Sequence, residues 1–417
     1  MGLVKRTYSR RLADDALDET LSRLPAVSLV GPRASGKTTT ASRHVASVVH
    51  LDRPAEAEVF RADPDAALAR QPEPVLLDEW QEVPQVLGAV KRSVDADASP
   101  GRFVLAGSVR AEFEVNAWPG TGRIVRLPMF PLTQREIAGT VGGRPSFVQR
   151  LSAARPDAFA GVSPAPNIID YVTMAVRGGF PDPVLTRGDA GAQQWLAGYV
   201  DELTHRDAQM LRAGLDASRF ASYIEAVAAN TAGVVDDATI LDAAHVNRRT
   251  GEAYWHVLEG LFVTEAVPAW WSSRLTRLVA LPKRYFVDTS LVVTLARLSL
   301  DGVLRDIDWV GRLLDTWVAM QLRPELALSP LRPRLHHLRT KAGQHEVDLL
   351  VEFGDGRVAA VEVKATAAPR PDDIRHLAWL RDQLGERFLM GVVLHTGPYD
   401  FALGDRLVAA PLSTLWV

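Results

Sequence analysis

The chain has 417 residues, of which 47% are hydrophobic and 23% charged, with a formal net charge of −3. This length predicts two or three domains of an ordinary globular protein, and the small net charge excludes a global attraction to nucleic acid. The absence of cysteine excludes disulfides, thiolate catalysis and Cys-ligated zinc, and it fits a cytoplasmic protein. No apolar run is long enough to cross a bilayer, so no membrane contact is expected.

The N-terminal segment combines a basic arm with an amphipathic stretch. Residues 5–11 are rich in Lys and Arg, and residues 12–23 have helical spacing. The arm could contact an anion or a neighbouring subunit, but its composition favours the solvated start of a helix.

A phosphate-binding loop pattern follows the first predicted strand. Residues 28–40, SLVGPRASGKTTT, contain G-x-x-x-x-G-K-[ST]. Residues 26–30 are typical of a short buried strand and residues 39–49 of a helix, so the motif has the strand–loop–helix setting that it requires. This setting favours a nucleotide site over a glycine-rich turn that happens to contain a lysine.

The chemistry of such a loop assigns a role to each of its residues. Backbone N–H groups would surround the β-phosphate, and the start of the helix would add a positive field. Lys37 would reach the β- and γ-phosphates, and the Thr38 hydroxyl would hold Mg²⁺. The predicted nucleotide-binding residues are Gly31, Pro32, Arg33, Ala34, Ser35, Gly36, Lys37, Thr38 and Thr39.

Two further buried strands end in polar residues. After a predicted strand at residues 48–52 and a helix-like run at 55–70, residues 74–80 read PVLLDEW. An apolar run that ends in two carboxylates is typical of a parallel strand with a site at its carboxyl end. Asp78 would orient a Mg²⁺-bound water, and Glu79 would polarise the water that attacks the γ-phosphate. Residues 101–108 form the next such strand, and Ser108 could contact the γ-phosphate or that water.

The order GPRASGKT, LLDEWQEVP, FVLAGSVR and GRIVRLPMFPLTQREI resembles the ATP-binding AAA+ proteins of bacteria and archaea. These couple an ATPase core to a C-terminal region of unknown function, so the resemblance implies an α/β core with a parallel sheet that uses ATP and Mg²⁺. It also implies that Ser108 is the first sensor. Arg123 is the candidate for a charge-neutralising arginine, in the same subunit or from a neighbour, with Arg126 and Arg110 as rivals.

The resemblance extends past residue 160 through RGGFPDP at residues 177–183. The intervening residues 139–166 are rich in Gly, Pro and Ser, which favours the boundary of the ATPase core. Three short amphipathic helices at residues 220–232, 236–244 and 247–260 then precede a strand pair at 261–266 and 284–288. This order predicts a winged helix.

The predicted winged helix has a local excess of positive charge. Residues 245–285 contain six Lys or Arg and three Glu, and the proposed wing contributes Arg274, Arg277, Lys283 and Arg284. Such charge suits phosphate contacts, and DNA is favoured over RNA. Winged helices also serve as protein-contact or spacer modules, so the sequence leaves both alternatives open.

A second constellation of charged residues lies near the C-terminus. Residues 344–351 and 358–364 predict a β-hairpin with Asp348 on its first strand and Glu362 and Lys364 on its second. These three resemble the D…ExK signature of the PD-(D/E)XK nuclease superfamily. The resemblance implies that Asp348 and Glu362 bind Mg²⁺ and that Lys364 positions the attacking water. Asp315, on a predicted helix, falls where many members have a Glu that supports the metal. Members can also keep the carboxylates for structure alone.

Three units follow from these patterns: an AAA+ core at residues 1–160, a helical and winged-helix region at 161–300, and a nuclease-like α/β domain at 301–417. The predicted function is ATP hydrolysis that controls engagement of nucleic acid, with metal-dependent cleavage left open. The alternative is a nucleotide-driven switch or scaffold whose inactive nuclease-like domain binds a protein partner or other subunits of a homo-oligomer.

Overall fold

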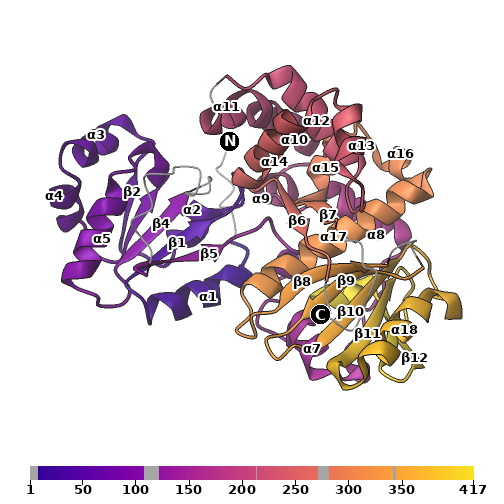
Figure 1. The fold of residues 1–417 in the computed structure, drawn as a ribbon. Helices are drawn as coiled ribbons and strands as arrows, with labels where there is room; N and C mark the ends of the chain where they lie inside the picture. Colours follow the sequence, from indigo (N-terminus) through magenta and orange to yellow (C-terminus); the bar gives the residue numbers. More distant parts are fainter. Residues whose placement is uncertain (1–7, 108–121, 213, 271–280, 341–343) are drawn as a thin grey trace. The chain divides into compact units, whose positions relative to one another are not determined.

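The computed structural model describes residues 8–107, 122–212, 214–270, 281–340 and 344–417. The chain divides into two compact units. The N-terminal unit comprises Arg10–Pro131 and Val257–Val263, and the C-terminal unit comprises Leu132–His256 and Thr264–Val417 together with the described residues 8 and 9 (Figure 1). The ATPase core was predicted to extend to residue 160, but residues 132–160 belong to the C-terminal unit. The predicted regions 161–300 and 301–417 also fall mostly within that one unit.

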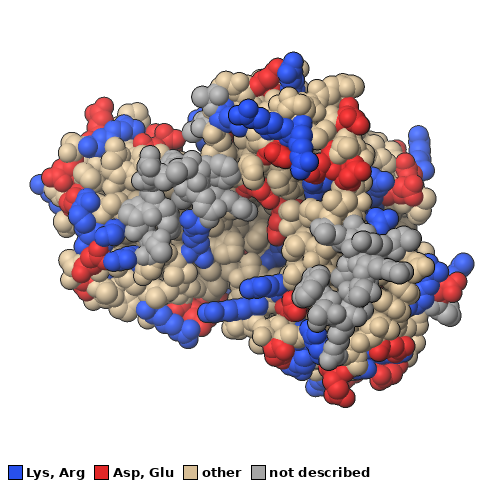
Figure 2. All heavy atoms as spheres, viewed as in Figure 1, with Lys and Arg blue, Asp and Glu red and all other residues tan. Residues whose placement is uncertain are grey.

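Charges of both signs are interspersed on the face shown in Figure 2, as expected for a net charge of −3. Within the described ranges, no helix combines the length and the apolar character needed to span a bilayer.

The N-terminal unit is a five-stranded parallel sheet in the order β2-β3-β4-β1-β5, with helices between the strands. Because all strands run the same way, their carboxyl ends meet at one edge of the sheet. The elements are α1 (Leu12–Leu21), β1 (Ala26–Val30), α2 (Lys37–Ala41), β2 (Ser47–His50), α3 (Pro54–Ala62), α4 (Pro64–Ala69), β3 (Val75–Asp78), α5 (Val86–Ala96), β4 (Phe103–Gly107) and β5 (Ile124–Pro128).

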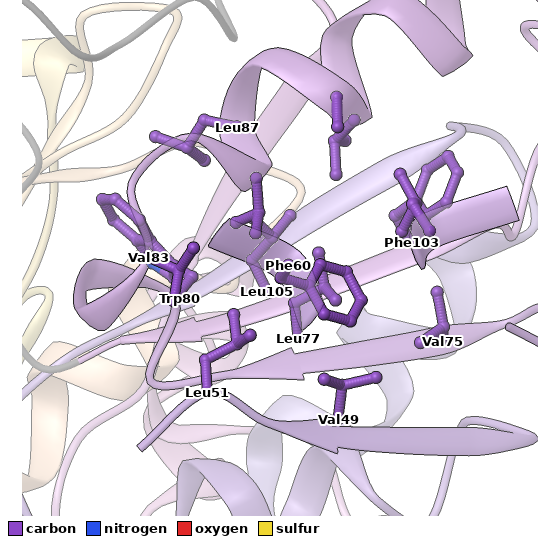
Figure 3. Close-up of a cluster of buried hydrophobic side chains, with 14 of the residues drawn as sticks. Val49, Leu51, Phe60, Val75, Leu77, Trp80, Val83, Leu87, Phe103 and Leu105 are labelled. Carbon is purple, nitrogen blue, oxygen red and sulfur yellow. The ribbon is translucent and has the colours of Figure 1, made fainter. Parts of the chain in front are cut away.

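Apolar side chains on one face of this sheet form its core. Val49, Leu77 and Leu105 from three neighbouring strands are buried together with Phe60 of α3 and Leu87 of α5 (Figure 3). Their strands are almost continuously apolar, as expected where both faces of a parallel sheet are covered. This packing fixes the strand ends at which the polar residues lie.

The helix after the phosphate loop is much shorter than predicted. It ends at Ala41, whereas helical spacing extended to residue 49. His44 lies between two carboxylates of α1, with Nε2 3.0 Å from Asp14 and Nδ1 2.6 Å from Asp18. The following residues then pair with β3 as strand β2. Tertiary contacts therefore override the local periodicity.

The C-terminal unit contains a six-stranded mixed sheet in the order β12-β13-β11-β10-β9-β8 and a separate pair, β6-β7. Strands β8, β9 and β10 are antiparallel, and β10, β11 and β13 are parallel. Its strands are β6 (Thr264–Val267), β7 (Lys283–Phe286), β8 (Arg334–Arg339), β9 (Glu346–Glu352), β10 (Val358–Lys364), β11 (Phe388–His395), β12 (Phe401–Gly404) and β13 (Leu407–Pro411).

Helices precede and cover this sheet. They include the predicted helix–helix–helix–hairpin order, since α12, α13 and α14 come directly before the antiparallel pair β6-β7. The helices are α6 (Gln134–Ile137), α7 (Phe147–Ala153), α8 (Ile168–Arg177), α9 (Pro181–Thr186), α10 (Asp189–Glu202), α11 (Ala208–Leu211), α12 (Ala217–Ala229), α13 (Asp237–Ala243), α14 (Arg248–Gly260), α15 (Thr289–Leu295), α16 (Leu300–Leu304), α17 (Ile307–Ala327) and α18 (Arg375–Leu384).

The long helix α17 holds the segment that follows the N-terminal unit. The Gln134 amide donates to Gln321 Oε1 at 2.7 Å, and Arg135 pairs with Glu325 at 3.4 Å. The other Glu325 oxygen accepts from the Val148 amide at 3.1 Å. Both α17 side chains are buried, so these bonds satisfy groups that would otherwise be costly to bury.

The glycine pair of the RGGFPDP element has a packing reason. The Gly179 amide donates to buried Asp288 Oδ2 at 2.9 Å. A Cβ on Gly178 would lie 2.1 Å from Asp288 Oδ1, and one on Gly179 would lie 2.1 Å from the Leu132 carbonyl oxygen. Only glycine allows this close approach.

Candidate functional site

The phosphate loop lies at the carboxyl end of β1, between that strand and α2, as predicted. Ala34 and Gly36 both have left-handed backbones, with φ of 57° and 96°, and they curl the loop toward its own centre. A Cβ on Gly31 would lie 1.9 Å from the Met129 carbonyl oxygen, so the loop can start here only with glycine. The sequence motif thus has the geometry of an anion-binding turn.

Lys37 is buried inside this turn. Its ammonium donates to the carbonyl oxygens of Gly31 at 3.0 Å and Pro32 at 2.7 Å. Burial lowers the pKa of Lys37 to about 8, although Glu79 and Asp78 act in the opposite direction. A partly desolvated cation held at the centre of a loop of amides is suited to a phosphate anion.

Thr38 and Asp78 meet at the same edge of the sheet. The Thr38 hydroxyl donates to Asp78 Oδ1 at 2.8 Å, and His50 Nδ1 lies 3.3 Å from Oδ2. Burial raises the pKa of Asp78. A hydroxyl and a carboxylate are hard oxygen ligands of the kind that Mg²⁺ prefers, so these two residues fit the predicted metal site.

Glu79 follows directly and has an unusual backbone. Its φ of 50° is left-handed, which is strained for a residue with a side chain. The side-chain amide of Gln81 donates a hydrogen bond to Glu79 Oε2 and thereby orients the carboxylate. Glu79 was predicted from the LLDEWQEVP stretch, but Gln81, two positions further along, was not.

Arg11 is a second residue that sequence reasoning missed. The basic arm was expected to be solvated, but Arg11 is only 4% exposed. Its guanidinium donates to the carbonyl oxygens of Ser35 at 2.8 Å and Phe130 at 2.6 Å, so it ties the phosphate loop to the end of β5. Its partners are 24 and 119 residues away in the chain, so no local pattern marks this role.

The predicted arginine lies far from this edge. Strands β1 and β5 are parallel and start side by side. Arg123 directly precedes β5, whereas the phosphate loop follows the last residue of β1, so the two lie at opposite ends of this strand pair. One strand length, roughly 16 Å, separates the two ends. Arg123 also pairs with Asp95 at 2.8 Å. It therefore cannot complete the site of its own subunit, and a role toward a neighbouring subunit stays a prediction. Ser108 and Arg110 lie outside the described residues.

The C-terminal sheet brings the second set of predicted residues close together. Asp348 lies on β9, Glu362 and Lys364 on β10, and Asp315 on α17. Lys364 Nζ is 2.8 Å from Glu362 Oε1. The Val363 amide donates to Asp348 Oδ2 at 3.0 Å. The predicted hairpin is confirmed, and β10 has the predicted bounds.

An unexpected lysine lies between the two aspartates. Lys283 Nζ is 2.5 Å from Asp315 Oδ2 and 3.0 Å from Asp348 Oδ1. It was predicted to contact phosphate from the wing, but its side chain is only 3% exposed. The prediction of Lys283 as a surface phosphate contact is therefore wrong, because its ammonium pairs with two carboxylates that are 32 and 65 residues away in the chain.

Burial sets the protonation of this cluster. It raises the pKa of Asp315 to about 6 and, with the charge of Asp348, that of Glu362 to about 8. Burial would also raise the pKa of Asp348, but Lys283 holds it below its ordinary value. Among the described residues, no group of three or more His, Cys, Asp or Glu is arranged to hold a metal ion. The predicted metal set of Asp315, Asp348 and Glu362 is thus not gathered around one point.

Three described basic side chains of the predicted winged helix pair with acids. Arg284 pairs with Asp237 and stacks over Trp255, with its Cζ 5.2 Å from the ring centroid. Arg248 pairs with Glu252 at 2.8 Å. These residues line a pocket of about 210 Å³ between α13, α14 and β7. Arg274 and Arg277 lie outside the described residues.

Three family models match parts of the chain. Residues 23–138 match an AAA domain, which includes the phosphate loop, Asp78 and Glu79. The AAA match covers most of the N-terminal unit, which is therefore AAA-like. Residues 168–302 match a domain of unknown function (DUF8612), and residues 310–415 match another (DUF4143).

Relatives and a solved structure extend the comparison along the chain. The uncharacterized proteins Mb2031c of Mycobacterium bovis and Rv2008c of Mycobacterium tuberculosis are each 26% identical over 408 residues, which is 96% of this chain and 83% of theirs. The Walker-type ATPase PABY2304 of Pyrococcus abyssi is 13% identical with a TM-score of 0.44, covering 69% of this chain and 96% of its own. A likeness at this level adds no argument about activity.

Proposed function

We propose that the AAA-like unit binds ATP with Mg²⁺ and hydrolyses it. The hydrogen bond between Thr38 and Asp78 is the main support, because it brings the loop hydroxyl and the strand-end carboxylate together beside buried Lys37. When bound, Mg²⁺ would neutralise charge on the β- and γ-phosphates. Thr38 and Asp78 are the residues that would hold it.

In this proposal each residue of the site has a separate role. Lys37 exchanges its two loop carbonyls for phosphate oxygens, which are stronger acceptors for an ammonium. Glu79, held by Gln81, accepts a proton from the attacking water as general base. Arg11 keeps the loop fixed through the Ser35 carbonyl and takes no part in the chemistry.

Two substitutions test this assignment. Lys37→Ala should abolish ATP binding, because the loop loses its only buried ammonium. Glu79→Gln should still bind ATP but hydrolyse it at least about 10²-fold more slowly, since general-base contributions are typically ~10²–10⁴. Calorimetry measures binding and phosphate release measures turnover. Glu79→Gln turning over ATP at the wild-type rate would refute the role of Glu79, and unchanged ATP binding by Lys37→Ala would refute the site.

For the output of ATP hydrolysis we favour the switch or scaffold over the nucleic-acid hypothesis. Three basic residues of the predicted winged helix pair with acids: Lys283 with Asp315, Arg284 with Asp237, and Arg248 with Glu252. Each paired cation offers less net charge to a phosphate backbone.

Nucleic-acid binding has a clear signature that separates the two outputs. A protein that neutralises several phosphates loses affinity steeply as salt rises. We expect the full chain with Mg²⁺ and ATP to show no salt-dependent binding of duplex DNA or RNA in fluorescence anisotropy, and no cleavage. Binding that weakens with salt and is lost in Arg248→Gln would instead favour the nucleic-acid hypothesis.

A further inference from the structure

We propose that Lys283 is a built-in cation that takes the place of a divalent metal in the C-terminal carboxylate cluster and closes that cluster to metal ions. The inference concerns the C-terminal unit alone and does not depend on ATP binding. Strand β7 thereby contributes a residue to the cluster, whereas all the residues predicted for it lie on β9, β10 and α17.

The hydrogen bonds of the two aspartates are the first argument. Lys283 Nζ contacts one oxygen of Asp315 and one of Asp348. The second oxygen of Asp315 accepts from the Tyr285 hydroxyl at 3.0 Å, and that of Asp348 accepts from the Val363 amide at 3.0 Å. Every carboxylate oxygen of this pair therefore has a donor. A metal ion would have to displace at least the lysine, since Mg²⁺ needs oxygens at about 2.0–2.1 Å.

The charge balance is the second argument. Lys283 Nζ lies within hydrogen-bond distance of both aspartates, and Lys364 Nζ lies 2.8 Å from Glu362 Oε1. Each carboxylate of the cluster therefore already has an ammonium beside it. A divalent ion that entered while Lys283 remained would add two positive charges next to an ammonium that is only 3% exposed, which like-charge repulsion and desolvation disfavour.

The position of Lys283 in the fold is the third argument. It lies on β7, paired with Val267 of β6, and so comes from the region that precedes the sheet. Tyr285, two positions further along the same strand, also contacts Asp315. Alternation along the strand places both side chains on one face, so β7 provides two donors for the same carboxylate. This arrangement joins the hairpin to α17 and β9 through a single ammonium.

The test measures Mn²⁺ binding by electron paramagnetic resonance on the full chain without nucleotide. Every protein in the comparison contains Asp78→Asn, which removes the carboxylate of the phosphate-loop site. With Lys283 in place, no stoichiometric Mn²⁺ should bind. Lys283→Met, which retains most of the length of the side chain but removes its charge, should bind one Mn²⁺ at least about tenfold more tightly, because two carboxylates lose their cation. Adding Asp348→Asn to Lys283→Met should abolish that binding.

Two outcomes would overturn the proposal. One is stoichiometric Mn²⁺ binding by the protein with Lys283 that Asp348→Asn removes, which would show an open site. The other is a folded Lys283→Met that gains no Mn²⁺. If Lys283→Met is unfolded in the absence of metal, circular dichroism is used to measure whether Mn²⁺ restores its secondary structure. Recovery of folding by Mn²⁺ then supports the exchange of lysine for metal, and failure to recover contradicts it.

Discussion

At the scale of single residues, the titration of Glu362 can be tested by unfolding. Its folded pKa is about 8 against an ordinary value of 4.5, so the folded chain holds this proton more tightly than the unfolded chain. The stabilisation is complete below pH 4.5 and is lost as pH rises toward 8. The free energy of unfolding therefore falls by at most about 1.4 kcal/mol per pH unit through this group.

Glu362→Gln should therefore flatten the pH dependence of unfolding. Gln keeps the shape of the protonated side chain but does not titrate, so the free energy of unfolding should fall less between pH 4.5 and 8 than that of the wild type, in which Glu362 adds to the loss caused by Asp315. Denaturant unfolding at several pH values measures the difference. Glu352→Gln on the neighbouring strand β9 is the control, since it makes the same change at a carboxyl group that is more exposed than that of Glu362. Parallel pH profiles for Glu362→Gln and the wild type would contradict the assignment.

At the scale of elements, the junction of β1 with the phosphate loop depends on the lack of a side chain at Gly31. The neighbouring Met129 amide donates to the Val30 carbonyl at 2.8 Å, which continues the pairing of β1 with β5. A Cβ at Gly31 would lie 1.9 Å from the Met129 oxygen, so the two segments would have to separate. The loop and the strand pair therefore form one structural element.

Gly31→Ala should weaken both stability and nucleotide binding. We expect a loss of roughly 1–3 kcal/mol in the N-terminal unit, as for other overpacked positions, together with a large loss of ATP affinity. Gly88→Ala on α5 is the matched control. Its Cβ would meet only the flexible end of Arg92 at 3.1 Å, and alanine favours a helix by up to about 1 kcal/mol. Thermal unfolding measures the stability of the two variants, and calorimetry measures their ATP affinity. Equal stability and equal ATP affinity of Gly31→Ala and Gly88→Ala would refute the steric argument.

The elements also show what the sequence could reveal. The loop, Asp78 and Glu79 were predictable because a local motif and an apolar strand mark them. The end of α2 was not, because His44 is held by α1. Lys283 was assigned to the wrong role for a similar reason: its carboxylates are distant in sequence, and a lysine on a predicted wing has no local feature that indicates burial.

At the scale of the whole molecule, each compact unit has its own sheet and its own core. We therefore expect two unfolding transitions in calorimetry. ATP with Mg²⁺ at about 100 times its dissociation constant should stabilise the N-terminal unit by about 2.7 kcal/mol and leave the other transition unchanged. Lys37→Ala should remove this shift. A single transition, or equal shifts of both, would contradict independent units.

The contacts of α17 have a practical consequence for dissecting the protein. A truncation at the limits of the C-terminal family match, residues 310–415, would start inside this helix and discard the segment that supplies partners to Gln321 and Glu325. It would also discard Lys283, the ammonium that contacts both Asp315 and Asp348. Such a fragment should aggregate on expression, and one beginning near Leu132 is the shorter piece that retains these bonds.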